Sequence, residues 1–346
     1  MQFAPVPSTA AASPLDLVCP AGSLPALKAA VDNGANCVYL GLRDATNARN
    51  FAGLNFDEAA IRGGIRYAHE RNAKVFMALN TYPQASNPDL WRGAMDKAVD
   101  LGVDAVILAD PGLMQYAADR YPRMRLHLSV QGSATNYDAI NFYREQFGIV
   151  RAVLPRVLSL SQVAQVIEKT QVEIEVFGFG SLCVMVEGRC ALSSYVTGES
   201  PNTHGVCSPP KAVRWQETPQ GLESRLNGVL IDRYAPTENA GYPTLCKGRF
   251  DVADDTNYYA IEEPTSLNTL ELLPQLLKMG VRAVKIEGRQ RSPAYVAQVT
   301  RVWRQAIDHC LANPHRYAPR PEWLRDLDGV AEGQQHTLGA YHRAWK

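Results

Sequence analysis

Short apolar runs alternate along the chain with longer segments in which apolar residues recur at helical spacing. Continuous apolar runs of this length are typical of strands buried on both faces, and the segments between them predict amphipathic helices. Seven runs precede a region rich in cysteine and one follows it. The eight predicted strands are 17–19, 37–40, 75–79, 105–108, 126–130, 152–154, 172–176 and 281–286.

Helix signals follow the strands in the expected places. Ser23 is placed to cap the first helix, which should end near Gly34, and residues 57–72 predict the second. After the cysteine-rich region, residues 270–279 read as a helix interrupted by Pro274, and 293–312 as a last helix with one apolar stripe. Eight strand–helix units in succession predict an α/β fold of the (β/α)8 TIM-barrel type over residues 15–312.

The two ends of the chain lack this pattern. Residues 1–14 are rich in Ala, Pro and Ser and are predicted to form a disordered tail. Residues 313–346 form a C-terminal extension whose aromatic residues either anchor it on the barrel or offer a surface to a partner. The sequence leaves these two alternatives open.

The composition of the chain argues against some classes of function. The 346 residues carry 35 basic and 35 acidic side chains, so the formal net charge is zero. This balance argues against broad electrostatic attraction to nucleic acid or to anionic lipid, and no nucleic acid is expected as a partner. No apolar run approaches the roughly 18 to 20 residues of a transmembrane helix, and the first residues lack the features of a signal peptide. We therefore expect a cytoplasmic protein with no transmembrane segment.

Four of the seven cysteines lie in one region rich in glycine, proline and serine: Cys183, Cys190, Cys207 and Cys246. Disulfides are disfavoured because the expected compartment is reducing. Structural zinc usually takes close cysteine pairs, which are absent here, whereas an iron–sulfur cluster suits wide, loop-borne spacing. Spacing alone favours the cluster and leaves zinc open, should Gly188 bend the segment. Cys19, Cys37 and Cys310 lie in apolar patterns and are predicted to pack in the core.

Two stretches of this region, 175–183 and 188–193, resemble the signature of the collagenase-like "peptidase U" family. Further stretches at 19–22, 46–56, 195–203 and 263–269 resemble one branch of it, the UbiU-type ubiquinone biosynthesis proteins. The resemblance covers nearly the whole chain after residue 15. It implies a [4Fe–4S] cluster on Cys183, Cys190, Cys207 and Cys246, carried by an insertion over residues 181–257 after the seventh strand.

The resemblance also implies an activity. It is the O2-independent hydroxylation of ubiquinone precursors, with prephenate as the hydroxyl donor, by a heterodimer with a UbiV-type partner. A prenylated precursor would need a lipid-binding carrier protein or an interface groove to reach the site. Other branches of the family hydroxylate bases in RNA, so an RNA-base hydroxylase is the alternative within the enzymes. A noncatalytic iron–sulfur scaffold is the alternative outside them.

The barrel rule places chemistry at the carboxyl ends of the strands, and several polar residues fall there. The predicted substrate-binding residues are Arg49, Asn55, Asn80, Gln131, Asn136 and Arg156. Arginine suits a dicarboxylate because guanidinium binds carboxylate in a bidentate fork. Asn136 is equally compatible with capping the next helix, and Asp110 with turning the chain. His127, within a strand, is predicted to be a core histidine.

Lys285, Glu287 and Arg289 are the predicted catalytic residues. Alternate positions on a strand share one face, and a carboxylate between two cations stays ionised. An internal ion-pair layer of the barrel would give the same pattern, and the sequence does not separate the two. Proteolysis is disfavoured because His69-Glu70 is not followed by a second histidine at zinc-protease spacing and Ser181 lacks the Gly-x-Ser-x-Gly context.

Overall fold

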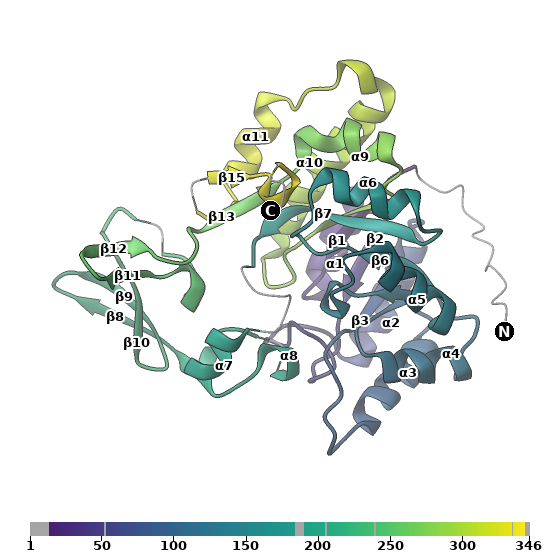
Figure 1. The fold of residues 1–346 in the computed structure, drawn as a ribbon, viewed down its shortest axis with the longest axis horizontal. Coiled ribbons are helices and arrows are strands. Elements are labelled where there is room, and N and C mark those ends of the chain that lie inside the picture. The colour runs from purple at the N-terminus through teal and green to yellow at the C-terminus, as the bar shows by residue number, and fades with distance from the viewer. Residues whose placement is uncertain are drawn as a thin grey trace.

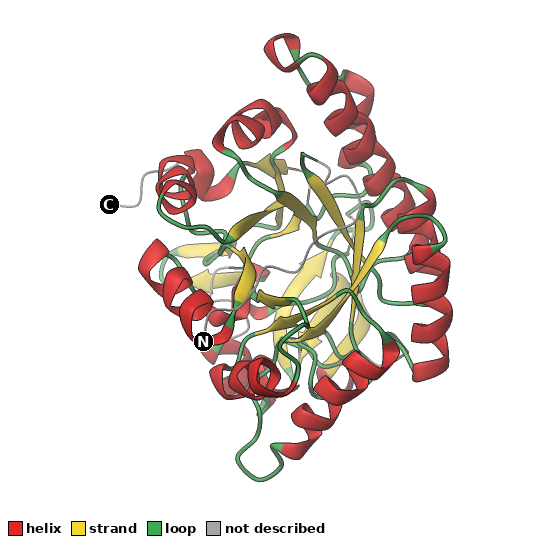
Figure 2. Cartoon of the chain, turned by 90° about the vertical axis from the view of Figure 1, so that its right-hand side faces the viewer, coloured by secondary structure: helices red, strands yellow, loops and turns green. Residues whose placement is uncertain are grey.

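A closed barrel of eight parallel strands forms the centre of the molecule (Figure 2). The computed structural model describes residues 14–51, 53–183, 190–204, 206–238, 240–333 and 335–342. The barrel strands are β1 (Asp16–Pro20), β2 (Cys37–Leu40), β3 (Lys74–Leu79), β4 (Ala105–Leu108), β5 (Leu126–Leu128), β6 (Ile149–Val153), β7 (Glu173–Ser181) and β14 (Ala283–Ile286). Each run of apolar residues in the sequence thus corresponds to one barrel strand.

The last strand closes the barrel. Val284 of β14 is in register with Leu17 of β1 on one side and with Val176 of β7 on the other, and both pairings are parallel. The predicted (β/α)8 fold is therefore confirmed. Because the helices cover the outside, these strands are apolar on both faces rather than on alternate residues.

A ring of helices surrounds the strands (Figure 2). The helices are α1 (Leu24–Asp32), α2 (Glu58–His69), α3 (Asp89–Leu101), α4 (Pro111–Arg120), α5 (Tyr137–Phe147), α6 (Leu160–Glu168), α9 (Leu273–Met279) and α10 (Pro293–Ala312). Ser23 caps α1 as expected, since its side chain accepts a hydrogen bond from the Ala26 amide. The single-turn helix η4 (Leu270–Leu272) precedes α9, so Pro274 lies in the first turn of α9 and does not kink it.

Two cores lie on opposite sides of the strands. The larger one, between strands and helices, holds the fully buried side chains of Trp91, Trp303 and Phe56, together with Cys19 and Cys310. The smaller one fills the barrel interior and includes Cys37, Tyr39 and Phe76. The three cysteines predicted to pack in the core are all buried.

Strand β7 continues beyond the barrel. Its last residues pair antiparallel with β13 (Thr265–Asn268), which in turn pairs parallel with β15 (Gln335–Thr337). The C-terminal extension also contains η5 (Pro314–Arg316), α11 (Pro321–Asp328) and η6 (Gly339–His342). Trp323 of α11 is buried and donates its indole N–H to the Gln305 side chain of α10 at 3.0 Å. The extension is thus fastened to the barrel at both α10 and β13.

The cysteine-rich insertion projects to one side of the barrel (Figure 1). It contains α7 (Ala191–Thr197), α8 (Pro201–His204), η2 (Pro210–Ala212), β8 (Val213–Thr218), β9 (Gly221–Leu226), β10 (Val229–Tyr234), η3 (Leu245–Lys247), β11 (Arg249–Val252) and β12 (Asp255–Tyr259). Strands β8–β10 form an antiparallel sheet and β11–β12 a hairpin. The predicted end of the insertion, residue 257, lies inside β12.

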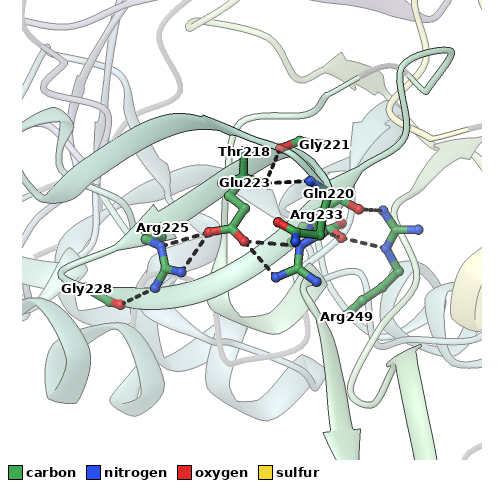
Figure 3. Close-up of polar contacts among 9 residues, drawn as sticks. Thr218, Gln220, Gly221, Glu223, Arg225, Gly228, Arg233 and Arg249 are labelled. Atoms are coloured by element: carbon green, nitrogen blue, oxygen red, sulfur yellow. Dashed lines mark hydrogen bonds and ion pairs between the residues drawn. The ribbon is translucent and has the colours of Figure 1, made fainter.

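Ion pairs reinforce this small antiparallel sheet (Figure 3). The buried Glu223 carboxylate accepts hydrogen bonds from both Arg225 and Arg233, at 2.7 Å for the closest nitrogen of each. Asp232 accepts from Arg249 of β11 at 2.6 Å. The apolar core beneath is small, with Val213, Leu226 and Ile231 as its buried members.

The predicted disordered tail, residues 1–14, lies outside the described residues except for Pro14. None of the described helices is long and apolar enough to cross a membrane.

Candidate functional site

A carboxylate held between two arginines lies at the carboxyl ends of the barrel strands. Glu287 directly follows β14, and its Oε1 is 3.3 Å from Nη2 of Arg49, which comes from the loop after β2. Its Oε2 forms a short ion pair with Arg156, from the loop after β6. Three segments far apart in the sequence thus meet at one carboxylate.

The two arginines keep Glu287 ionised. Burial alone would raise the pKa of this carboxyl, but Arg156 and then Arg49 lower it below its ordinary value. Arg156 is itself fixed, because its guanidinium stacks on Phe177 with 3.5 Å between the guanidinium carbon and the ring centroid. Glu287 therefore holds two cations in place at the barrel mouth.

The sequence predicted that Lys285 and Arg289 would flank Glu287, and this detail is wrong. The cations that flank it come from other strand ends, because the backbone turns immediately after β14. Gly288 has φ +150°, and alternation along a strand no longer applies once the strand has ended.

A small cavity of about 40 Å³ lies within the barrel. Its lining includes Lys285, Arg289 and Asn80, three of the predicted site residues. The rest of the lining is Tyr39, Ala78, Ile107, Ser129, Val130 and Val153. This volume is well below the roughly 300 Å³ at which small-molecule pockets begin, so binding of an organic ligand requires the cavity to widen.

Lys285 belongs to an internal ion-pair layer. Its ammonium lies 2.7 Å from the Glu175 carboxylate of β7, and the other oxygen of that carboxylate is 3.5 Å from Arg151 of β6. All three side chains are buried. The structural alternative considered for this position is therefore present, and it accounts for the lysine at the cavity floor.

Arg289 is held differently. The side chain is buried and donates one hydrogen bond, at 2.7 Å, to the amide oxygen of Asn47. No acidic side chain of the described residues forms an ion pair with it. Burial lowers its pKa to about 10. A buried guanidinium that lines a cavity without a carboxylate is an incomplete charge arrangement, and a bound anion would complete it.

Two further predicted binding residues, Asn80 and Asn55, are buried and belong to hydrogen-bond networks near the cavity and the Arg49 loop. Asn80 donates to Ser129 at 3.3 Å and accepts from the Ala48 amide at 3.1 Å, beside the cavity. Asn55 is buried at φ +70° and donates to the Arg49 carbonyl at 2.7 Å, so it shapes the loop that carries Arg49.

Gln131 is buried next to the cavity, and its side-chain oxygen has no hydrogen-bond partner among the described residues. Asn136 is exposed and caps α5, accepting from the Ala139 amide at 2.8 Å. Asp110 likewise caps α4. For these last two residues, the local structural alternative is what the chain adopts.

His127 is enclosed in the barrel interior as a core residue. Its ring packs edge-on against Phe76 at 4.8 Å between centroids, and neither ring nitrogen has a hydrogen-bond partner among the described residues. Burial lowers its pKa well below the ordinary value, so it is neutral at physiological pH. It does not line the cavity.

The cysteines of the insertion lie on loops and short turns. Cys183 and Cys207 are exposed, and Cys190 and Cys246 are partly exposed. Cys190 precedes α7, and its sulfur accepts the Ser193 amide at 3.3 Å. Burial raises the pKa of the Cys246 thiol to about 11.

These residues fit the donor set of an iron–sulfur cluster, namely cysteine thiolates on irregular backbone with an amide N–H directed at a sulfur. Within the described parts of the chain, which omit 184–189 between the first two cysteines, no three His, Cys, Asp or Glu side chains are grouped as ligands of one ion.

The cysteine loops adjoin the mouth of the barrel. Arg49, from the loop after β2, pairs with Glu287 at this mouth. In the same loop, Phe51 contacts Tyr242 of the insertion edge-on, at 6.2 Å between ring centroids. Tyr242 donates its hydroxyl to the Ser208 carbonyl at 3.0 Å, next to Cys207. The loop after β2 is thus shared between the cavity side and the cysteine side.

Sequence reasoning missed four residues of this site: Tyr39, Asn47, Ser129 and Glu175. Tyr39 lies under both cations, 4.0 Å from the Lys285 ammonium and 5.5 Å from the Arg289 guanidinium. Its inward direction could have been found from alternation with Cys37 on the predicted second strand. No comparable pattern marks Asn47, which lies in an irregular loop.

Comparison with known proteins identifies relatives over nearly the whole chain. The family model described as Peptidase family U32 matches residues 22–343. The tRNA hydroxylation protein P1 of Bacillus subtilis is 31% identical, covering 93% of this chain and 70% of that protein. The tRNA hydroxylation protein P of Escherichia coli is 32% identical, covering 94% and 76%.

Other similar proteins carry peptidase names. An uncharacterized protease of Methanocaldococcus jannaschii is 33% identical, covering 95% of this chain and 73% of that protein. A solved structure described as the U32 peptidase Mk0906 aligns with a TM-score of 0.48 at 11% identity, covering 84% of this chain and 98% of that one.

Proposed function

Because this chain belongs to peptidase family U32, and because several similar proteins are named for tRNA hydroxylation, we propose that it is an iron–sulfur protein of a hydroxylation reaction. The observation that carries this proposal is the position of Arg49. Its side chain pairs with Glu287 at the barrel mouth, and Phe51 of the same loop contacts Tyr242 of the insertion, whose hydroxyl donates to the Ser208 carbonyl next to Cys207. One loop thus joins a cationic pocket to the cysteine region.

In this proposal Cys183, Cys190, Cys207 and Cys246 hold a [4Fe–4S] cluster. When bound, such a cluster supplies one-electron redox chemistry. The chain's own residues do the remaining work. Glu287 orients Arg49 and Arg156, and the loop after β2 connects the cavity side to the cysteine region.

The hydroxyl donor in this proposal is a small organic anion rather than molecular oxygen. Arg289 supports it, since this buried cation faces the cavity without a carboxylate partner in the described chain. Prephenate, a compact dicarboxylate, has the required charge. One carboxylate would meet Arg289, and a second would lie near Arg49 and Arg156, where guanidinium groups bind carboxylates in a fork.

Transfer RNA is the acceptor that the relatives favour. The similar proteins of Bacillus subtilis and Escherichia coli carry that substrate in their names and align over more than nine tenths of this chain. The zero net charge of the chain requires that any RNA-binding surface be local.

A ubiquinone precursor is the second candidate, favoured by the stretches that resemble UbiU-type proteins. Residues 46–56 supply Asn47, Arg49 and Phe51 to the site, and residues 195–203 begin in α7 beside Cys190. Tyr195 in the second stretch is 91% exposed. This candidate entails a UbiV-type partner in a heterodimer, a lipid-binding carrier and a cytoplasmic location.

A strain without this gene, grown with and without oxygen, tests both acceptors at once. Mass spectrometry would measure the quinones and the modified nucleosides of tRNA in each culture. Loss of ubiquinone with build-up of an under-hydroxylated precursor, only in the anaerobic culture, supports the quinone acceptor. Loss of a hydroxylated nucleoside supports tRNA. Unchanged quinones and unchanged nucleosides would overturn the hydroxylation proposal.

Complementation separates an enzyme from a scaffold. The deletion strain would receive either the wild-type gene or the Glu287→Gln variant, with equal protein levels checked by immunoblot. We expect wild type to restore the missing product and the variant to restore little of it. Full restoration by the variant would favour a noncatalytic iron–sulfur scaffold.

A further inference from the structure

A buried ion pair connects the C-terminal extension to the residue that follows Cys246. The Lys247 ammonium lies 2.8 Å from Oε2 of Glu332. The Lys247 side chain is only 7% exposed, and that of Glu332 is 26% exposed. Lys247 shares the single turn of η3 with Cys246, so the pair acts on the backbone of that turn.

Glu332 is itself fixed against the barrel. Its amide donates to the Ser266 hydroxyl of β13 at 2.7 Å. The next residue, Gly333, has φ +70°, and a Cβ placed there would lie 1.7 Å from the Pro264 carbonyl oxygen. Only glycine can make that approach. The chain then continues into β15, which pairs with β13.

The turn with Cys246 is also held from its other side. The Glu262 amide donates to the Cys246 carbonyl at 3.1 Å, a few residues before β13 begins. The turn therefore lies between two attachments to the same strand. One of these attachments depends on Glu332, which is far away in the sequence.

We propose that the C-terminal extension is a strap that positions the fourth cysteine of the cluster through the Lys247–Glu332 ion pair. This inference rests on the cluster of the proposed function. Glu332 is a positioning residue, since it touches neither the cysteine nor the cavity. Removing its carboxylate leaves the buried Lys247 ammonium without its ion-pair partner, with Glu262 as the remaining nearby carboxylate, and opening of the turn would let water reach the ammonium.

Three variants and one control test the strap. Glu332→Gln and Lys247→Met each break the pair, and Lys247→Arg keeps a cation in place. The control, Glu322→Gln, removes a carboxylate from the same extension, where the ion pair with Arg320 spans 3.9 Å and both side chains are more than half exposed. Such an exposed pair contributes little to stability.

The first measurement is the loss of the cluster in intact protein. Each variant would be purified without oxygen, analysed for iron and sulfide, and then exposed to a chelator while its visible absorbance is followed. We expect about fivefold faster loss in Glu332→Gln and Lys247→Met, on the ground that breaking a buried pair is strongly destabilising. Lys247→Arg and Glu322→Gln should lose the cluster at the wild-type rate. Circular dichroism would show that every variant is folded.

The second measurement does not need the cluster. Amide hydrogen exchange of the cluster-free protein, read by mass spectrometry on peptides over 244–262, should be about fivefold faster in Glu332→Gln than in wild type or Glu322→Gln. Equal exchange in these proteins would overturn the strap, whatever the iron content. Wild-type protein without iron and sulfide would instead overturn the proposed cluster, and with it the role of the strap in holding it.

Discussion

Lys285 and Arg289 line the same cavity, yet their charges are balanced in different ways. Lys285 is paired with the buried Glu175, whereas among the described residues the hydrogen-bond acceptor of Arg289 is the neutral Asn47. The charge of Lys285 is thus balanced by a carboxylate in the ligand-free protein, whereas the charge of Arg289 is not. Substitution of each residue should therefore separate stability from ligand binding.

Arg289→Met should weaken binding of an anionic ligand and leave the fold intact. We expect the dissociation constant for prephenate, measured by calorimetry on cluster-loaded protein, to rise at least about tenfold, because a charge-assisted hydrogen bond is lost. The free energy of unfolding in urea should stay within about 1 kcal/mol of wild type, since the lost charge was uncompensated. Unchanged binding would show that the cavity cation does not bind the donor.

Lys285→Met is the matched comparison, because it should change stability rather than ligand binding. It leaves the Glu175 carboxylate buried with Arg151 as its remaining cation, so we expect the free energy of unfolding to fall by up to about 3 kcal/mol. Urea unfolding followed by circular dichroism checks this. A variant as stable as wild type would mean that the internal layer is not what fixes Lys285.

The pH dependence of stability should reveal the state of Glu287. Its pKa is lowered in the folded protein, so its contribution is complete above the unfolded value of about 4.3 and is lost as pH falls through the folded value. The difference in urea midpoint between wild type and Glu287→Gln should therefore be constant above about pH 5 and shrink below it. A difference that already shrinks between pH 7 and pH 5 would contradict a carboxylate kept ionised by two arginines.

At this scale the sequence predicted which residue types gather at the barrel mouth, but not their partners. Arg49, Arg156 and Glu287 were all expected there, because each follows a predicted strand. The pairing among them depends on loop paths of irregular backbone, which carry no periodicity. For Asn136 the two alternatives were indistinguishable in sequence, since an asparagine before a helix suits both a cap and a ligand.

At the scale of the elements, strand β7 pairs in two places. It is a strand of the barrel, and its last residues pair antiparallel with β13. Gly180 lies where these meet, at φ +135°, and a Cβ there would come 2.5 Å from Cβ of Glu287. Glycine is thus required both by the backbone conformation and by the carboxylate beside it.

Gly180→Ala should displace Glu287 and lower the free energy of unfolding by about 2 kcal/mol, with loss of most hydroxylation activity. Gly63→Ala in α2 is the control, because nothing lies within 4 Å of its added Cβ. There we expect a gain of about 0.5 to 1 kcal/mol from helix propensity. Urea unfolding and complementation of the deletion strain measure both effects. Full activity in Gly180→Ala would mean that the Glu287 position is not critical.

The barrel strands were predictable because each is a compact apolar run, while β13 and β15 were not. Thr265–Asn268 is short and polar, and it is a strand only because the extended end of β7 offers it a partner. The small sheets of the insertion escaped prediction for a similar reason. Their apolar core is small, and ion pairs such as Glu223 with Arg233 join neighbouring strands without an apolar pattern in the sequence.

The whole molecule joins a large barrel core to an insertion with few buried apolar residues. In the proposed function, the cluster supplies what the insertion lacks, as metal binding does in other small domains. Removal of the cluster with a chelator should therefore make residues 190–260 the first site of limited proteolysis, with the barrel peptides protected. Mass spectrometry of the fragments checks this. Identical fragments before and after chelation would show that the insertion is stable by itself.

Closure of the barrel has a consequence for how the chain folds. Asp16 of β1 pairs with Ala283 of β14. Because the insertion lies between them in the sequence, β1 cannot pair with β14 until the insertion has been synthesised. Until then β1 and β7 present unpaired edges of apolar strands, which are templates for aggregation. Contacts of such high sequence separation also slow folding. The nascent chain should therefore depend on chaperones for longer than a barrel without an insertion.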